Sequence, residues 1–137
     1  MITRYTREVM GRLFTDQARL ENWLKVELAA TEALAERGIV PKAALDAIKK
    51  KSAVNVERAL EIEQTTNHDV IAFVTSVAEK IGPHGRYLHW GLTSSDVTDT
   101  ALALQLMQAL DLLIEDSDQL LAALRMQAES YATQPMV

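Results

Sequence analysis

The residues from His89 to Thr100 carry the densest chemistry in the chain: one imidazole, five hydroxyls and two carboxylates within twelve positions. A mostly apolar run follows directly. Such a segment is unfavourable inside a helix but typical of a helix start, where side-chain oxygens and free backbone N–H groups can converge on an anion. We therefore expect Thr93 and Ser94 to contribute to a binding site for an anionic small molecule.

Two other segments could complete this site. In Thr66-Asn67-His68-Asp69, we expect Asn67 to be the N-cap of a helix and His68 its first residue. An imidazole beside free N–H groups can receive a carboxylate or phosphate, and Asp69 could orient the ring. The alternative is that these residues only make a favourable helix N-terminus. Arg4 and Tyr5, taken alone, are typical of a surface.

The region around His89 also allows a structural and a functional interpretation. His89 lies in a connector and could bind an anion or donate a proton, or it could bond a backbone carbonyl between helices. Thr93 and Asp96 have the spacing of a capping box. Because a cap needs one hydroxyl and the segment offers several, we favour a ligand-binding role for the cluster.

The composition argues against several classes of ligand and partner. The chain has no Cys and three scattered His, and nothing in it resembles a metal-ligand set or a Gly-rich phosphate loop, so we expect no metal site. A net charge of −5 argues against nucleic acid as a partner. The apolar run from Ala101 to Ile114 is shorter than the roughly 20 residues of a membrane span. We therefore expect a cytoplasmic protein that contacts no membrane.

The apolar periodicity predicts an all-α fold. A small helical domain is expected over residues 1–92, and the first long helix of a bundle over 93–137. Caps and breakers place the boundaries: Thr15 or Asp16, then Gly38 and Pro41, then Asn55, Asn67, the Gly82-Pro83 pair and finally Thr93. We expect the helix after Asn55 to bury residues Val56, Ala59, Leu60 and Ile62. His84, in the Gly-Pro turn, is expected to be solvated.

The last predicted helix is apolar around nearly its whole circumference between Leu102 and Ile114. Such a helix must be surrounded by protein, and the preceding helices are too few to cover it. The chain stops at Gln134-Pro135-Met136-Val137 without a terminal cap. We therefore expect an N-terminal part of a longer protein, and we expect this chain alone to self-associate.

Taken together, these residues resemble the bacterial adenylosuccinate lyases, a branch of the fumarase/aspartase superfamily. The match runs from the opening Met-Ile-x-Arg-Tyr through Leu60-Glu61-Ile62-Glu63 and His68-Asp69-Val70 to His89-x-Gly-Leu-Thr-Ser-Ser-Asp-Val-x-Asp-Thr. The last motif is the most specific, because the Gly-Leu-Thr-Ser form with a preceding His is most similar to this branch.

The resemblance implies a homotetrameric helical bundle that cleaves adenylosuccinate to AMP and fumarate by β-elimination, without a cofactor. The same site would cleave the succinyl-carboxamide ribotide of purine synthesis. By position, Arg4 and Tyr5 are similar to nucleotide contacts, and His89 to a phosphate-binding histidine. Thr93 and Ser94 resemble the succinyl-carboxylate binders. Substrate binding is also implied for Asn67, His68 and Asp69, with His68 assisting proton transfer.

Two departures limit what the resemblance implies. Many relatives have a basic residue at the position of Asn67, so a contact there would be weaker. The family's general-acid histidine and its base, a serine on a glycine-rich loop, lie beyond these 137 residues, so we expect the chain alone to be inactive. The alternatives are a non-catalytic helical interaction module, or a lyase of the same superfamily that releases fumarate from another compound.

Overall fold

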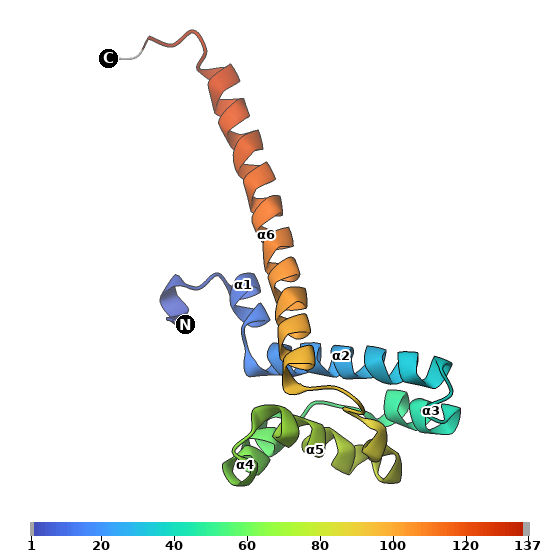
Figure 1. Ribbon diagram of the computed structural model, residues 1–137. Helices are drawn as coiled ribbons and strands as arrows, with labels where there is room; N and C mark the ends of the chain where they lie inside the picture. Colours follow the sequence, from blue (N-terminus) through green and yellow to red (C-terminus); the bar gives the residue numbers. More distant parts are fainter. Residues whose placement is uncertain (1, 136–137) are drawn as a thin grey trace.

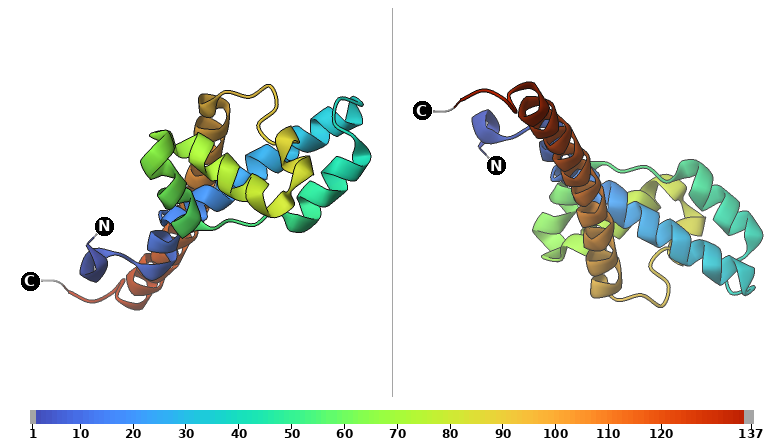
Figure 2. Two further views of the ribbon diagram at one scale, coloured as in Figure 1. Left: turned by 90° about the horizontal axis from the view of Figure 1, so that it is seen from below. Right: turned by 90° about the horizontal axis from the view of Figure 1, so that it is seen from above.

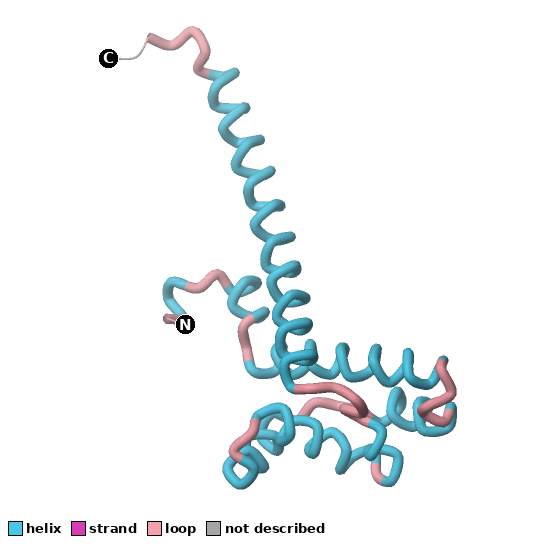
Figure 3. The backbone as a smooth tube through the Cα atoms, viewed as in Figure 1, coloured by secondary structure: helices cyan, strands magenta, loops and turns pink. Residues whose placement is uncertain are grey.

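The computed structural model describes residues 2–135, and every regular element among them is helical (Figures 1 and 3), as the sequence predicts. Met1 of the opening motif and the final Met136-Val137 lie outside the described residues. The elements, in chain order, are η1 (Thr3–Tyr5), α1 (Glu8–Leu13), α2 (Asp16–Glu36), α3 (Lys42–Lys51), α4 (Val56–Thr66), α5 (Asp69–Ile81), η2 (Pro83–Tyr87) and α6 (Ser94–Ser130).

The helices form a packed base and a projecting rod. Figure 1 shows α2 lying across the N-terminal end of α6, with α3, α4 and α5 in a second layer below α2. The rest of α6 extends away from this base, and Figure 2 shows the same arrangement from below and above. The hydroxyl-rich segment at the start of α6 therefore lies where the rod joins the base.

Local capping chemistry explains most of the helix boundaries. The Thr15 side chain accepts the Ala18 N–H at 3.2 Å and so begins α2. Asn55 accepts the Arg58 N–H at 3.0 Å and begins α4. Gly38 follows α2 with φ of +73°, a conformation that a glycine adopts without strain. These boundaries confirm the predicted ones.

The break between α4 and α5 differs from the prediction by one residue. Asn67 is not the N-cap of α5: it is the C-cap of α4, in the left-handed conformation with φ of +50°. His68 takes the N-cap position, and Asp69 becomes the first helical residue. The physical reason is that asparagine tolerates the left-handed region better than most residues, so one Asn can both end a helix and reverse the chain.

The core lies between α2, α5 and the start of α6. The Trp23 ring meets the Phe73 ring edge to face, with centroids 5.5 Å apart. The buried apolar cluster around this pair comprises Leu20, Ile48, Ala59, Val70, Val77, Ile81, Leu88, Val97 and Ala101. Leu60 was expected to be buried but is exposed, because it faces away from α5 while Ala59 and Ile62 face inward. His84, expected to be solvated, is half-buried.

Only the beginning of α6 is covered. Val97, Ala101, Gln105 and Ala109 are buried, whereas Leu106, Leu110 and Leu113 are each about half exposed, at 47%, 55% and 51%. By length and composition alone α6 could also cross a membrane, which the sequence analysis did not anticipate. Its polar groups instead hold the N-terminal segment: Gln105 donates to the Leu13 carbonyl and Asp116 pairs with Arg7.

Candidate functional site

The turn before α5 and the first residue of α6 meet through a pair of side chains. His68 Nε2 lies 3.2 Å from Ser94 Oγ, although 26 positions separate the two residues. His68 Nδ1 accepts the Ile71 N–H at 3.4 Å as the N-cap of α5. In the neutral ring Nε2 then carries the proton and donates to Ser94 Oγ, which leaves the serine O–H free to donate to a ligand.

The capping box predicted for α6 is present. Asp96 Oδ2 accepts the Thr93 backbone N–H at 2.7 Å and the Thr93 hydroxyl at 3.1 Å. The proton of the Thr93 hydroxyl is therefore used within the cap, and that oxygen can only accept a further hydrogen bond. Of these two neighbours, Ser94 is the better donor for an anion at this helix N-terminus.

His89 is fixed by a residue that sequence reasoning missed. Glu27 of α2 is buried, with 1% of its surface exposed. Its Oε1 lies 2.6 Å from His89 Nδ1, and its Oε2 accepts the His89 backbone N–H at 2.8 Å. The signal was available, because Glu27 lies four residues after Trp23 and four before Thr31, so the three residues share one face of the helix.

The backbone at His89 is itself unusual. Its φ is +60°, in the left-handed region that residues other than glycine rarely adopt. The two bonds from Glu27 hold this conformation from the ring side and from the backbone side. Positive φ at a histidine next to a buried carboxylate is the kind of local strain that accompanies functional sites.

An ion pair at the surface braces the hairpin that presents His68. Arg58 of α4 donates to both carboxylate oxygens of Glu79 on α5, at 2.9 and 2.7 Å. The guanidinium holds the pKa of Glu79 below its usual value, and the hydrogen bonds that Arg58 donates to Glu79 and then to Glu61 raise the pKa of Arg58. This bridge ties α4 to α5 and so supports the turn at Asn67 and His68.

Asp69 and Asn67 face different surroundings from the His68–Ser94 pair. Asp69 Oδ1 accepts the Val70 N–H at 2.7 Å and lies 3.7 Å from His68 Nδ1. Asp69 also lines a small cavity of about 250 Å³ with Trp23 and Thr98. Asn67 instead borders a shallow hollow on α4.

The structure does not bring the N-terminal pair to the other candidates. The Arg4 guanidinium lies over the Tyr5 ring, 4.9 Å from its centroid, and Tyr5 is exposed. Among residues 2–135, no hydrogen bond or ion pair joins either residue to His68, His89 or Ser94. Figure 1 shows η1 beside α6, away from the start of α5.

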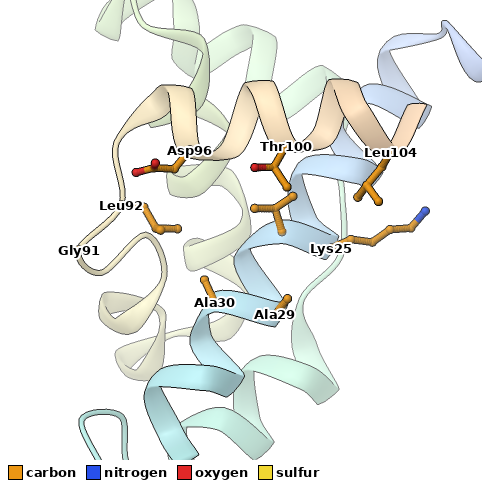
Figure 4. A pocket seen from close by; sticks show the side chains of 9 residues that line it. Lys25, Ala29, Ala30, Gly91, Leu92, Asp96, Thr100 and Leu104 are labelled. Atoms are coloured by element: carbon orange, nitrogen blue, oxygen red, sulfur yellow. The ribbon is translucent and has the colours of Figure 1, made fainter. Parts of the chain in front are cut away.

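A hollow of about 860 Å³ runs between α2 and the start of α6 (Figure 4). Its walls are mainly apolar, with Lys25 and Asp96 as its charged members. The lining comprises Lys25, Val26, Ala29, Ala30, Gly91, Leu92, Asp96, Thr100 and Leu104. None of the three residues His68, His89 and Ser94 lines this groove, so the groove is separate from the site that contains them. Within the described residues, no three His, Asp or Glu side chains are grouped to hold a metal.

The chain is similar to several known lyases. It is 53% identical over 137 residues to the adenylosuccinate lyase of Synechocystis sp., and it spans 32% of that protein's length. Among solved structures, a fumarate lyase from Mesorhizobium sp. BNC1 is 30% identical with a TM-score of 0.70, and the match covers 80% of this chain and 27% of that one. The 3-carboxy-cis,cis-muconate lactonizing enzyme from Pseudomonas putida is 35% identical with a TM-score of 0.81, over 92% of this chain and 30% of that one.

The family match covers nearly the whole chain. Residues 3–137 match the protein family described as lyase. That range contains η1, the turn at His68, the Glu27–His89 pair and all of α6. The resemblance inferred from the sequence motifs is therefore confirmed, and the chain belongs to the lyase family.

Proposed function

We propose that the full-length protein containing this chain is a cytoplasmic adenylosuccinate lyase. The observation that carries the proposal is the 53% identity to a curated adenylosuccinate lyase along all 137 residues. The reaction would release fumarate from adenylosuccinate to give AMP, and from the succinyl-carboxamide ribotide of purine synthesis. In this proposal residues 1–92 form a helical domain and residues 93–137 begin the bundle.

The binding chemistry follows from the start of α6. A carboxylate of the succinyl group would accept the Ser94 hydroxyl proton and the free backbone N–H groups of the first turn, where the helix dipole favours negative charge. His68 would lie against this group, because its Nε2 is 3.2 Å from Ser94 Oγ. His89 would bind the phosphate. Arg4 and Tyr5 would reach the nucleotide, while Asn67 and Asp69 would border the succinyl end.

The elimination itself needs a base and an acid. The base removes a proton from the carbon next to a carboxylate, the C–N bond breaks as the C=C bond of fumarate forms, and the acid protonates the departing nitrogen. Fixed donors around the carboxylate stabilise the negative charge that builds up before the bond breaks, so no cofactor is proposed. Since this chain spans 32% of its relative, we place the main acid and base in the remainder of the protein, with His68 assisting.

The exposed face of α6 supports an oligomer. The apolar side chains that it leaves exposed include Leu106, Met107, Leu110, Leu113, Ile114, Leu120, Leu121 and Leu124. A face of this size is removed from water by packing against further helices. We propose that copies of the full-length protein, as a homotetramer, cover it. Light scattering of this chain alone should show self-association, and a clean monomer at high concentration would count against the proposal.

A fumarate-release assay tests the function. The full-length protein should release fumarate from adenylosuccinate at an enzymatic rate, and the 137-residue chain alone should not. A panel containing adenylosuccinate, the carboxamide ribotide and a 3-carboxymuconate would distinguish the related activities. Turnover of a non-nucleotide substrate alone would overturn the assignment, and turnover by the isolated chain would overturn the placement of acid and base.

A further inference from the structure

Glu27 is an acidic side chain inside the core. It is 1% exposed, and among residues 2–135 His89 is the only residue that bonds its carboxylate. A buried ion is costly unless it is paired, and such pairs rarely stabilise a protein more than well-packed apolar residues would. A role beyond stability is therefore the better explanation for this carboxylate.

The geometry determines what Glu27 does to the imidazole. A carboxylate oxygen 2.6 Å from Nδ1 can only accept, so Nδ1 carries a proton. The same carboxylate holds the backbone N–H of His89 at 2.8 Å, at a φ of +60°. Ring and backbone are thus fixed together, and Nε2 has no partner among the described residues. Nε2 is therefore the ring nitrogen that remains available to a ligand.

We propose that Glu27 is a positioning residue for substrate: it fixes His89 with Nδ1–H directed inward and keeps Nε2 available to the phosphate of the nucleotide. The proposal rests on the proposed function for its substrate. Glu27 does not touch the substrate and acts only through His89. The competing explanation is that the pair merely ties the connector after η2 to α2.

Steady-state kinetics of the full-length protein separate the two explanations. With adenylosuccinate, Glu27→Gln should raise KM about 10- to 100-fold, the range expected for loss of a charge-assisted hydrogen bond, with kcat changed less than about threefold. With succinyladenosine, which lacks the phosphate, the same variant should leave KM close to that of the wild type. An equal loss with both substrates would overturn the proposal.

Matched variants exclude a general effect of the substitution. Glu32→Gln changes the same residue type on the same helix, where Glu32 pairs with Lys49 at the surface, and it should leave KM unchanged. In a His89→Gln background, Glu27→Gln should add little further loss, because the two residues act as one unit. Additive losses would contradict the proposal.

A measurement on the wild-type protein depends neither on enzymatic activity nor on the folding of the Glu27 variant. Imidazole ¹⁵N NMR, assigned through His89→Gln, should show a protonated Nδ1 with a strongly downfield proton, and an unprotonated Nδ1 would overturn the proposal. If the wild type releases no fumarate, the proposed function fails, while this spectrum still tests the Glu27–His89 bond. The two failures are therefore distinguishable.

Discussion

The two histidines near the start of α6 are held in opposite ways. His89 directs Nδ1 at the buried carboxylate of Glu27, and its side chain is 16% exposed. His68 directs Nδ1 at a backbone N–H, and its side chain is 43% exposed. Nδ1 of His89 donates a hydrogen bond, whereas Nδ1 of His68 accepts one. The two histidine rings therefore differ in which nitrogen carries the proton.

This contrast shows that burial determines whether disrupting a pair affects mainly stability or mainly activity. The Glu27–His89 pair is buried in the base of the molecule, where changing one partner leaves the other without compensation. The His68–Ser94 pair lies at an exposed helix junction, where the fold depends little on it. Disrupting the first should therefore affect stability and binding together, whereas disrupting the second should affect activity with little change in stability.

The largest expected effect is on stability at the buried pair. His89→Ala leaves the Glu27 carboxylate buried without a partner and should lower the free energy of unfolding by about 3 kcal/mol. His68→Ala removes a long capping bond and the exposed contact with Ser94, and it should cost about 1 kcal/mol. Urea denaturation of both variants measures the difference. Equal destabilisation by the two substitutions would remove the proposed contrast.

The next effect is on catalysis at the exposed pair. In the full-length protein, His68→Gln should lower kcat for fumarate release about 100-fold, the low end expected for a group that assists proton transfer. Ser94→Ala should lower kcat/KM about 10-fold through the loss of one donor to the carboxylate. Circular dichroism should be unchanged for both.

Ser95→Ala is the matched control for Ser94, because Ser95 is the neighbouring hydroxyl and is exposed. We expect its kcat/KM to stay within about twofold of the wild type. A loss at Ser95 equal to the loss at Ser94 would mean that the whole hydroxyl cluster, rather than the His68–Ser94 pair, defines the site.

A smaller effect is expected at the turn that presents His68. Asn67→Ala places a Cβ-bearing residue without a polar side chain at φ of +50° and should cost about 1 kcal/mol of unfolding free energy. Asn67→Gly should cost less, because glycine adopts this conformation without strain. Thermal unfolding of the two variants gives the comparison, and a glycine variant less stable than the alanine variant would contradict it.

The smallest expected effect is on thermal stability, at the Arg58–Glu79 ion pair that joins α4 to α5. Arg58 lowers the pKa of Glu79, so the bridge stabilises the fold above the usual carboxyl pKa, and this contribution is lost as the pH falls through the lowered value. At neutral pH Glu79→Gln should lower Tm by about 1–3 °C. The difference from the wild type should vanish in strong acid, and a difference that persists there would exclude the ion pair as its cause.

Local features of the sequence were sufficient to predict where most of the helices begin. Thr15, Asn55 and Thr93 cap helices as their side-chain chemistry requires. The apolar periodicity also predicted that the preceding helices are too few to cover α6, which its exposed leucines bear out for this chain. The turn at Asn67 was placed one residue off, because Asn favours both an N-cap and a left-handed C-cap, and only the path of the chain decides between them.

The sequence by itself determined the all-α class, most of the helix boundaries and the membership of the hydroxyl segment in a lyase motif, because each depends on neighbouring residues. Only the tertiary structure decided which distant side chains meet. The contact of His68 with Ser94 spans 26 positions and that of Glu27 with His89 spans 62. Such pairings are set by how α2, α5 and α6 pack around Trp23 and Phe73, and no local spacing encodes them.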